Sequence, residues 1–273
     1  MLRRKVQPLA VSVQPVWCCA GFEPCEAGRM ASEVAPGVHR VGNAYVNCYL
    51  IEDGNQLTLV DAGLPGFRAQ LDEYLRSRGR SIKDIAAVIL THGHGDHVGM
   101  ADGVRLDAPA PVYVHAADAQ MARTGKVHKR SGSVLPYLRH PAAWKLLGIF
   151  ARGGALKPLK VGEVTTFTGG DLDVPGRPRV IATPGHSPGH VVFHLPDRGV
   201  LIAGDALCSY NPLTGRRGPQ LMPKAFAADS LQALASLQAL ERLDAPLALF
   251  GHGEPWTEGL SKAVEQARER GLT

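Results

Sequence analysis

The feature that most constrains this chain is an apolar run that stops in a cluster of histidines, from Ala87 to Gly99 (AVILTHGHGDHVG). The continuous apolar character of Val88–Leu90 is typical of a strand buried on both faces of a sheet. Glycines follow the run, so the strand ends and the chain turns at Thr91. Four polar side chains come next, in the pattern HxHxDH: His92, His94, Asp96 and His97.

This spacing predicts a metal site. Residues two apart on an extended loop point the same way, so His92 and His94 can bind one ion. Asp96 and His97, at the first turn of the helix that follows, face a second ion nearby. A single histidine is usually structural or exposed to solvent, but four ligand-type side chains at this spacing are difficult to explain in that way. Imidazole and carboxylate together suit zinc, iron or manganese.

The hydrophobic pattern predicts further strands, several of which are followed by polar residues. We expect strands near residues 38–41, 46–52, 57–60, 88–90, 112–114, 164–167, 180–182, 191–194, 200–203 and 247–250, and helices over residues 67–78, 230–240 and 257–270. The polar residues after these strands are Asp61, His186, Asp205 and His252. Two sheets that meet face to face, with helices outside, would bring these ends to one edge.

Two of the polar residues have more than one interpretation. Asp61 directly follows an expected buried strand, where a carboxylate can cap a helix, form a turn or orient a metal-binding histidine. His190 comes four residues after His186 in TPGHSPGH, and we expect it to be structural or to support a ligand from outside.

An insertion at about residues 119–160 concentrates positive charge: it holds nine lysines and arginines and no acidic residue, whereas the whole chain has a net charge of +5. It also holds an apolar and aromatic stretch, Tyr137–Phe150. One interpretation is a pair of short helices with solvated basic residues. The other is a lid that selects an anionic or acyl-bearing substrate, with Tyr137, Trp144 and Tyr210 as candidate contacts. Contact with a membrane surface is less favoured, because Pro141 and Gly148 interrupt the stretch.

The overall composition favours an α/β enzyme. Residues 1–30 are expected to form a loose N-terminal extension and a poor signal peptide, and residues 31–273 a single domain. Of the five cysteines, three lie in the extension and two, Cys48 and Cys208, in apolar surroundings; no CxxC pair occurs among them. This pattern predicts reduced thiols and a cytoplasmic protein. No apolar run is long enough to span a membrane.

With these positions assembled, the chain from about Val34 onward resembles the metallo-β-lactamase superfamily, whose fold is an αββα four-layer sandwich. By that resemblance His92, His94 and His186 would hold a first metal ion, Asp96, His97 and His252 a second, and Asp205 would bridge both. Asp61 would orient a ligand. The resemblance implies a hydrolase with two zinc ions, iron or manganese being compatible with the same ligands, and a bridging hydroxide that attacks an ester, thioester or lactone. Asp96 is the candidate proton carrier.

The resemblance also narrows the branch of the superfamily. β-Lactamases of this superfamily lack the bridging aspartate, so Asp205 leaves β-lactam hydrolysis at most a side activity. The pattern is closer to glyoxalase II and the acyl-homoserine lactonases. Only 21 residues follow His252, so the helical domain with which glyoxalase II binds glutathione is not matched. Lactonases often carry a tyrosine three residues after the bridging aspartate, where this chain has Cys208, with Tyr210 two residues later.

Three other functions compete with this one. A mononuclear iron dioxygenase that oxidises persulfides has the same fold. A phosphodiesterase or nuclease would use the basic insertion to follow a phosphate backbone, but leucines and tryptophan separate these basic residues, so a nucleic-acid partner is not expected. A non-catalytic binding module is least favoured, because no ligand position is lost. We expect a small-molecule substrate, and a homodimer is compatible with the sequence.

Overall fold

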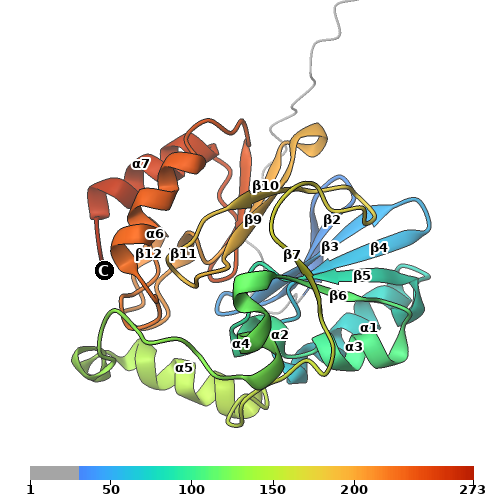
Figure 1. Cartoon of the computed structure of the whole chain (residues 1–273), viewed down its shortest axis with the longest axis horizontal. Coiled ribbons are helices and arrows are strands. Elements are labelled where there is room, and N and C mark those ends of the chain that lie inside the picture. Colours follow the sequence, from blue (N-terminus) through green and yellow to red (C-terminus); the bar gives the residue numbers. More distant parts are fainter. Residues whose placement is uncertain (1–30) are drawn as a thin grey trace, which may run out of the picture.

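A computed structural model of the chain describes residues 31–273 and is built around two β-sheets that lie face to face (Figure 1). The predicted N-terminal extension, with Cys18, Cys19 and Cys25, lies outside the described residues. Cys48 and Cys208 are buried free thiols, as their apolar surroundings predict. Within residues 31–273, no helix has both the length and the apolar character needed to cross a bilayer.

The first sheet has seven strands in sequence order: β1 (Ala31–Ala35), β2 (Val38–Gly42), β3 (Asn47–Asp53), β4 (Gln56–Val60), β5 (Ile85–Ile89), β6 (Val112–His115) and β7 (Thr165–Phe167). Strands β1 to β4 pair antiparallel, and β4 to β7 pair parallel. A turn at Asp53-Gly54 joins β3 to β4, with Gly54 at a φ of 58°. The carboxyl ends of β4 and β5 therefore lie side by side, and both are followed by candidate metal residues.

The second sheet has four strands: β8 (Arg179–Ala182), β9 (Val191–Leu195), β10 (Val200–Gly204) and β13 (Leu247–Phe250), in the order β13-β10-β9-β8. β10 and β13 are parallel, so their carboxyl ends also lie at one edge. A separate hairpin, β11 (Cys208–Tyr210) and β12 (Arg217–Gln220), follows β10.

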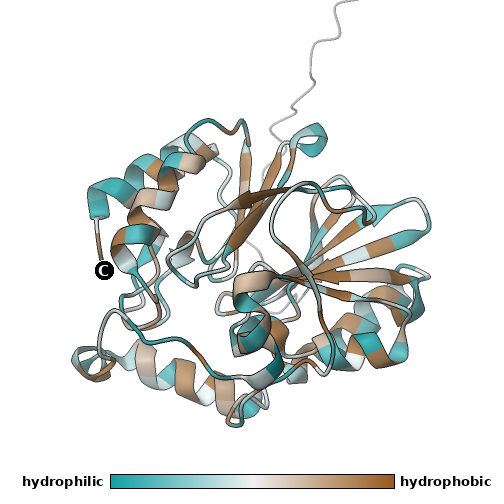
Figure 2. Cartoon of the chain, viewed as in Figure 1, coloured by the Kyte–Doolittle hydropathy of each residue, from teal (hydrophilic) through white to brown (hydrophobic). Residues whose placement is uncertain are grey.

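Helices cover the outer face of each sheet, and a continuous apolar core fills the space between the sheets. The helices are α1 (Arg68–Ser77), α2 (Gly95–Val98), α3 (Ala101–Asp107), α4 (Ala119–Thr124), α5 (Pro141–Arg152), α6 (Ser230–Ser236) and α7 (Leu260–Arg270). Ile51 and Val60 of the first sheet pack with Phe193 and Ile202 of the second, all fully buried. Figure 2 shows the apolar character of these strands. The order of layers confirms the predicted αββα sandwich.

The outer helices pack through their apolar stripes. Leu71 and Leu75 of α1 join the core on the outer face of the first sheet, and Ala263 and Val264 of α7 join that of the second. The final helix begins at Leu260, three residues later than predicted. Gly259 has a φ of 90°, which is not a helical backbone conformation, so the helix cannot include it. The other expected strands and helices all form, with boundaries shifted by a few residues.

Three strands were not predicted. β1 has a partly exposed face without apolar alternation, and β11 and β12 are short and joined by a polar loop. The basic insertion contains α4, a 3₁₀ turn at Leu135–Arg139 and α5, which agrees with the expectation of short helices. Leu146 of α5 is buried against Leu213 and Ala225, so the insertion packs on the second half of the chain.

Candidate metal centre

Three histidine nitrogens from two distant loops meet at one point. β5 ends at Ile89, and the loop after it carries His92 and His94, whose Nε2 and Nδ1 atoms are 3.0 Å apart. The loop between β8 and β9 carries His186, whose Nε2 is 2.8 Å from His94 Nδ1. His92 and His186 are buried. We call His92, His94 and His186 the first group.

A second group consists of Asp96, His97 and His252. The first two belong to α2, as the sequence predicted, and His252 follows β13. His252 Nε2 is 3.5 Å from Asp96 Oδ2. In each group the possible ligand atoms all lie within 4.8 Å of one another.

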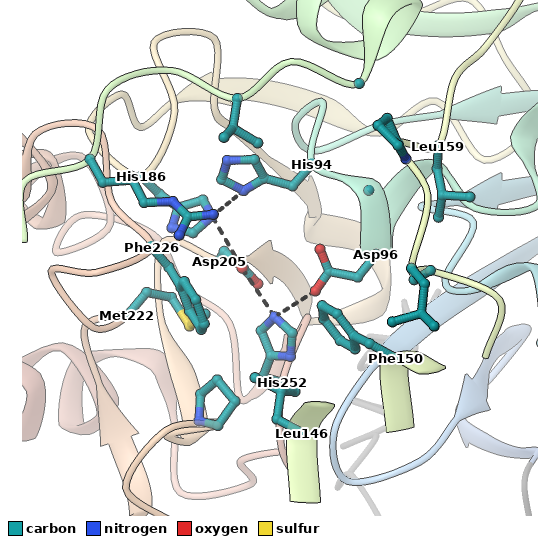
Figure 3. Close-up of a pocket in the computed structure, with 18 of the residues that line it drawn as sticks. His94, Asp96, Leu146, Phe150, Leu159, His186, Asp205, Met222, Phe226 and His252 are labelled. Atoms are coloured by element: carbon teal, nitrogen blue, oxygen red, sulfur yellow. Dashed lines mark hydrogen bonds and ion pairs between the residues drawn. The ribbon is translucent and has the colours of Figure 1, made fainter. Parts of the chain in front are cut away.

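Asp205, at the end of β10, lies between the two groups (Figure 3). Its Oδ2 is 3.3 Å from His186 Nε2 and 3.2 Å from His252 Nε2, and its Oδ1 is 3.5 Å from His97 Nε2. Although burial raises the pKa of this carboxyl, the neighbouring His252, His97 and His186 hold it well below its usual range. Asp205 is therefore a buried carboxylate surrounded by imidazoles.

The arrangement fits bound cations. His97 Nε2 and Asp205 Oδ1 are buried and have no hydrogen-bond partner within the described part of the chain. Such atoms destabilise a fold by about 1–3 kcal/mol each unless something binds them. Because they face each other across 3.5 Å among further imidazoles, a divalent cation bound there would satisfy both. All seven ligand positions predicted from the sequence converge on this place.

Asp61 orients the imidazoles of His97 and His92 through hydrogen bonds to atoms that do not face Asp205. His97 donates from Nδ1 to Asp61 Oδ2 at 2.9 Å, which leaves its Nε2 to face Asp205. The Thr91 hydroxyl donates to the same carboxylate at 2.8 Å and lies 3.0 Å from His92 Nδ1. Asp61 has a φ of 57°, which is unusual for a residue with a side chain. Strained backbone of this kind is found mainly at functional sites, which agrees with the predicted orienting role of Asp61.

His190 supports Asp205 rather than joining either group. Its Nε2 accepts the backbone N–H of Asp205 at 3.0 Å, and its Nδ1 pairs with the Thr183 hydroxyl at 2.8 Å. Burial lowers the pKa of His190 to about 3, so the ring is neutral and keeps an acceptor nitrogen. His252 is oriented similarly, because its Nδ1 donates to the carbonyl oxygen of Tyr45.

Sequence reasoning missed Asp118, a fully buried carboxylate that joins the two loops of the first group. Its Oδ2 accepts from the Gly93 N–H at 3.1 Å and from the Ser187 hydroxyl at 2.5 Å, and its Oδ1 accepts from the Gly189 N–H at 2.7 Å. The available signal was its place three residues after β6, at the same sheet edge as Asp61. Asp118 sets the distance between the loops that carry His94 and His186.

We expect Asp118→Asn to lower the affinity for metal about 10- to 100-fold, the usual range for partners that orient ligands. The amide turns an NH₂ group toward donors, so the unfolding free energy should also fall by about 1–3 kcal/mol. Zinc titration against a competing chelator and denaturant unfolding measure the two effects. Asp102→Asn is the matched control, because this partly buried carboxylate also accepts a backbone N–H, from Gly162, but lies outside both groups. Wild-type metal affinity in the Asp118 variant would contradict this role.

A cavity of about 290 Å³ opens above the two groups. His94, Asp96, His186, Asp205 and His252 form its floor, and the basic insertion forms much of its wall. Figure 3 shows the apolar side chains of Leu146, Phe150, Met222 and Phe226 around the floor. A substrate in this cavity would contact both groups and the insertion.

The three aromatic side chains that were candidates for substrate contact do not line this cavity. Trp144 is 59% exposed on the outer side of α5, and its indole N–H donates to the Leu138 carbonyl at 2.9 Å. Tyr137 packs in a small apolar cluster with Leu146. Tyr210 makes an edge-to-face contact with Tyr45. Two other residues of α5, Leu146 and Phe150, line the cavity instead.

Comparison with known proteins identifies the family to which this chain belongs. The family model of the metallo-beta-lactamase superfamily matches residues 41–252, most of the chain and all seven ligand positions. The chain belongs to the metallo-beta-lactamase superfamily. It is 29% identical over 236 residues to the "Probable metallo-hydrolase YflN" of Bacillus subtilis, covering 82% of this chain and 87% of that protein.

Solved structures of the superfamily are similar in fold. The metallo-beta-lactamase family protein TTHA1429 from Thermus thermophilus has 27% identity and a TM-score of 0.60, over 86% of this chain and 79% of that one. A HARLDQ motif mutant of a Cronobacter sakazakii metallo-β-lactamase has 21% identity and a TM-score of 0.64, over 88% and 92%. The second likeness shows the fold alone. Family membership and the metallo-hydrolase relatives make this protein a metal-dependent hydrolase.

Proposed function

We propose that this protein is a dinuclear zinc hydrolase that acts on an ester, thioester or lactone. The position of Asp205 between the two groups is the observation that supports two ions: Oδ2 faces His186 and His252, and Oδ1 faces His97. A site for one ion would not need a buried carboxylate shared in this way.

In the proposed site His92, His94 and His186 would hold the first ion, Asp96, His97 and His252 would hold the second, and Asp205 would contribute to both. Iron or manganese suits the same ligands. When bound, two such ions lower the pKa of water and polarise a carbonyl oxygen. No serine or cysteine nucleophile is needed in this mechanism.

Asp96 is proposed to move the proton. Its side chain is 15% exposed and points into the cavity, whereas Asp205 is buried (Figure 3). In hydrolysis, water adds to the carbonyl carbon, the bond to the departing oxygen or sulfur breaks, and that atom gains a proton. A carboxylate oxygen of Asp96 can accept the proton of water and return it to the departing group.

The apolar wall supports an acyl substrate. Leu146 and Phe150 come from α5, and Met222 and Phe226 from the segment after β12, so aliphatic carbon in the cavity would meet side chains on two sides. This wall does not suit a phosphodiester backbone, because it offers no row of cations to follow one. The place of Asp205 between the groups leaves β-lactam hydrolysis at most a side activity.

Elemental analysis of the purified protein, combined with a panel of a thioester, an ester, a lactone, a phosphodiester and a β-lactam, tests the proposal. We expect two zinc ions per chain and the highest kcat/KM on an acyl substrate. One iron per chain with oxidation of a persulfide would favour the mononuclear dioxygenase instead. Hydrolysis of a phosphodiester that falls steeply with salt would favour a nuclease.

Acidification should remove the second ion before the first. Burial lowers the pKa of His92 and His186 well below the usual value, so these ligands stay neutral as the pH falls. Burial also disfavours charge on His97 and His252, but Asp205 raises the pKa of both above the usual value, so they protonate earlier. Since only a neutral imidazole binds metal, metal content should fall from two ions to one as the pH is lowered, before the first group releases its ion.

Dialysis at each pH followed by elemental analysis measures this order. Samples returned to the starting pH serve as the control for irreversible unfolding. Loss of both ions in a single step, or earlier loss from the first group, would contradict the assignment of ligands to the two groups.

The location and the partners of the protein stay predictions. A cytoplasmic location was inferred from the cysteine pattern, and Cys48 and Cys208 are free thiols, which is compatible with it. A small-molecule substrate agrees with the size of the cavity. The homodimer stays an open prediction.

A further inference from the structure

Two cationic side chains at the mouth of the cavity have no ionic partner. Arg130 and Lys157 both line the cavity and belong to the basic insertion. Neither forms an ion pair with any residue between positions 31 and 273. The acidic side chains of the lining are Asp96 and Asp205, which the proposed metal ions would neutralise. The positive charge at the mouth is therefore available to a ligand.

Arg130 is fixed on the His186 side of the cavity. The next residue, Ser131, donates from its backbone N–H to the Ala227 carbonyl at 2.7 Å and from its hydroxyl to the Ala228 carbonyl at 3.0 Å. Ala228 in turn donates its N–H to the His186 carbonyl at 3.0 Å. The Arg130 guanidinium carbon lies 5.9 Å from the ring centre of Phe226. These contacts tie the position of Arg130 to a member of the first group.

Lys157 belongs to a segment that lies on the other side of the cavity, next to α2. The segment around it is tied at both ends, because the Ala155 N–H donates to the Phe150 carbonyl at 2.8 Å and the Val161 N–H donates to the Ala122 carbonyl at 2.9 Å. Leu159, from the same segment, packs beside α2, and Figure 3 shows it across the cavity from His186 and Phe226. The two segments that carry these cations therefore lie on opposite sides of the cavity floor.

Apolar and cationic surfaces therefore meet in one cavity. The walls from α5 and the segment after β12 offer aliphatic and aromatic carbon, and the mouth offers two positive charges. No acidic residue occurs between positions 119 and 160 to weaken their field. A neutral acyl compound would use the walls and leave both cations solvated, whereas a compound with an anionic group would use both.

We propose that the substrate carries an anionic group, a carboxylate or a phosphate-like group, joined by a short aliphatic chain to the scissile ester, thioester or lactone. The positive charges of Arg130 and Lys157 attract the anion into the cavity, and Leu146, Phe150, Met222 and Phe226 contact the chain. This inference rests on the proposed hydrolase function and names its substrate class. Arg130 and Lys157 determine specificity and take no part in bond cleavage.

Matched esters test the inference on the zinc-loaded protein. The p-nitrophenyl ester of hexanoate and the p-nitrophenyl monoester of adipate have the same chain length and leaving group, and differ in one terminal carboxylate. We expect kcat/KM for the adipate ester to exceed that for the hexanoate ester by about tenfold or more, the scale of one or two partly screened ion pairs. The ω-phosphono analogue distinguishes a phosphate-like anion from a carboxylate.

Paired variants assign the preference to the two side chains. In Arg130→Gln/Lys157→Gln, the ratio of the two kcat/KM values should fall close to one through a loss on the adipate ester, while the metal content stays unchanged. Arg139→Gln/Lys160→Gln removes the same charge from parts of the insertion that do not line the cavity, and should keep the wild-type ratio. In a second readout, calorimetric binding of hexyl phosphate should weaken about tenfold in the first pair only.

The outcomes separate this inference from the proposed function. If the wild-type protein cleaves both esters equally, or prefers hexanoate, the anion preference is wrong and the acyl hydrolase stands. If both variant pairs lose the preference equally, the general charge of the insertion is responsible, and the assignment to Arg130 and Lys157 is wrong. If neither ester is cleaved while a persulfide or phosphodiester is consumed, both the proposed function and this inference fail.

Discussion

Replacing Asp205 by asparagine is expected to remove one of two bound metal ions and to lower kcat by more than about 100-fold. Loss of a residue that only orients a metal ligand lowers metal affinity or activity about 10- to 100-fold. Loss of a carboxylate shared between two ions should lower them further. The asparagine amide can offer its oxygen to one group only, since its NH₂ must then face the other group, where His97 and His252 lie.

The backbone around position 205 should survive this change. The N–H of residue 205 still donates to His190, and the substitution keeps the size of the side chain. Loss of activity with an unchanged near-UV circular dichroism spectrum would therefore report on the metal site rather than on unfolding. Asp197→Asn, at an exposed turn after β9, is the control and should keep two ions and full turnover.

The measurement is metal content and single-substrate kinetics on the same preparation. Occupancy and turnover should fall together in the Asp205 variant. A variant that holds one ion and turns over at the wild-type rate would show that the two-ion mechanism is wrong.

The metal site could be predicted because its spacing is local and its strands are regular. His92 and His94 lie two residues apart, and Asp205 and His252 lie within two residues of the ends of parallel strands, which share an edge of their sheet. The same pattern predicted two sheets face to face with helices outside, and the resemblance to the metallo-β-lactamase superfamily implied the αββα sandwich. β11 and β12 escaped prediction because they are short and pair only with each other.

Long-range contacts explain what could not be predicted. The bond from Ser187 to Asp118 spans 69 residues, and no spacing rule connects such positions. In α5 apolar residues occupy both the inner and the outer face, so periodicity did not show that Leu146 and Phe150 face the cavity while Trp144 and Leu147 are exposed. Packing against the second half of the chain determines that choice.

Gly251→Ala is expected to displace the second ion without removing any ligand. A Cβ atom at position 251 would lie 2.2 Å from Asp205 Oδ1 and 2.7 Å from His97 Cε1, and atoms do not approach so closely. The backbone there cannot retreat easily, because the Gly251 N–H donates to the Gly204 carbonyl at 2.9 Å and the Gly251 carbonyl accepts from Asn47 at 2.9 Å. Asp205 and His97 must therefore turn away from each other.

We expect this variant to lose the second ion and about 100-fold or more in kcat, with the fold retained. Gly148→Ala is the matched control: a Cβ at position 148 of α5 would meet nothing within 4 Å. Alanine there should raise the unfolding free energy by about 0.5–1 kcal/mol and leave metal content unchanged.

The two substitutions separate the charge of the site from its shape. Asp205→Asn removes a charge and keeps the space, whereas Gly251→Ala keeps every charge and fills the space between two ligands. If both lose the second ion, then the carboxylate is needed and its position is needed. If Gly251→Ala keeps two ions and full activity, Asp205 Oδ1 and His97 Nε2 do not bind a common ion, and the second group does not form a metal site with Asp205.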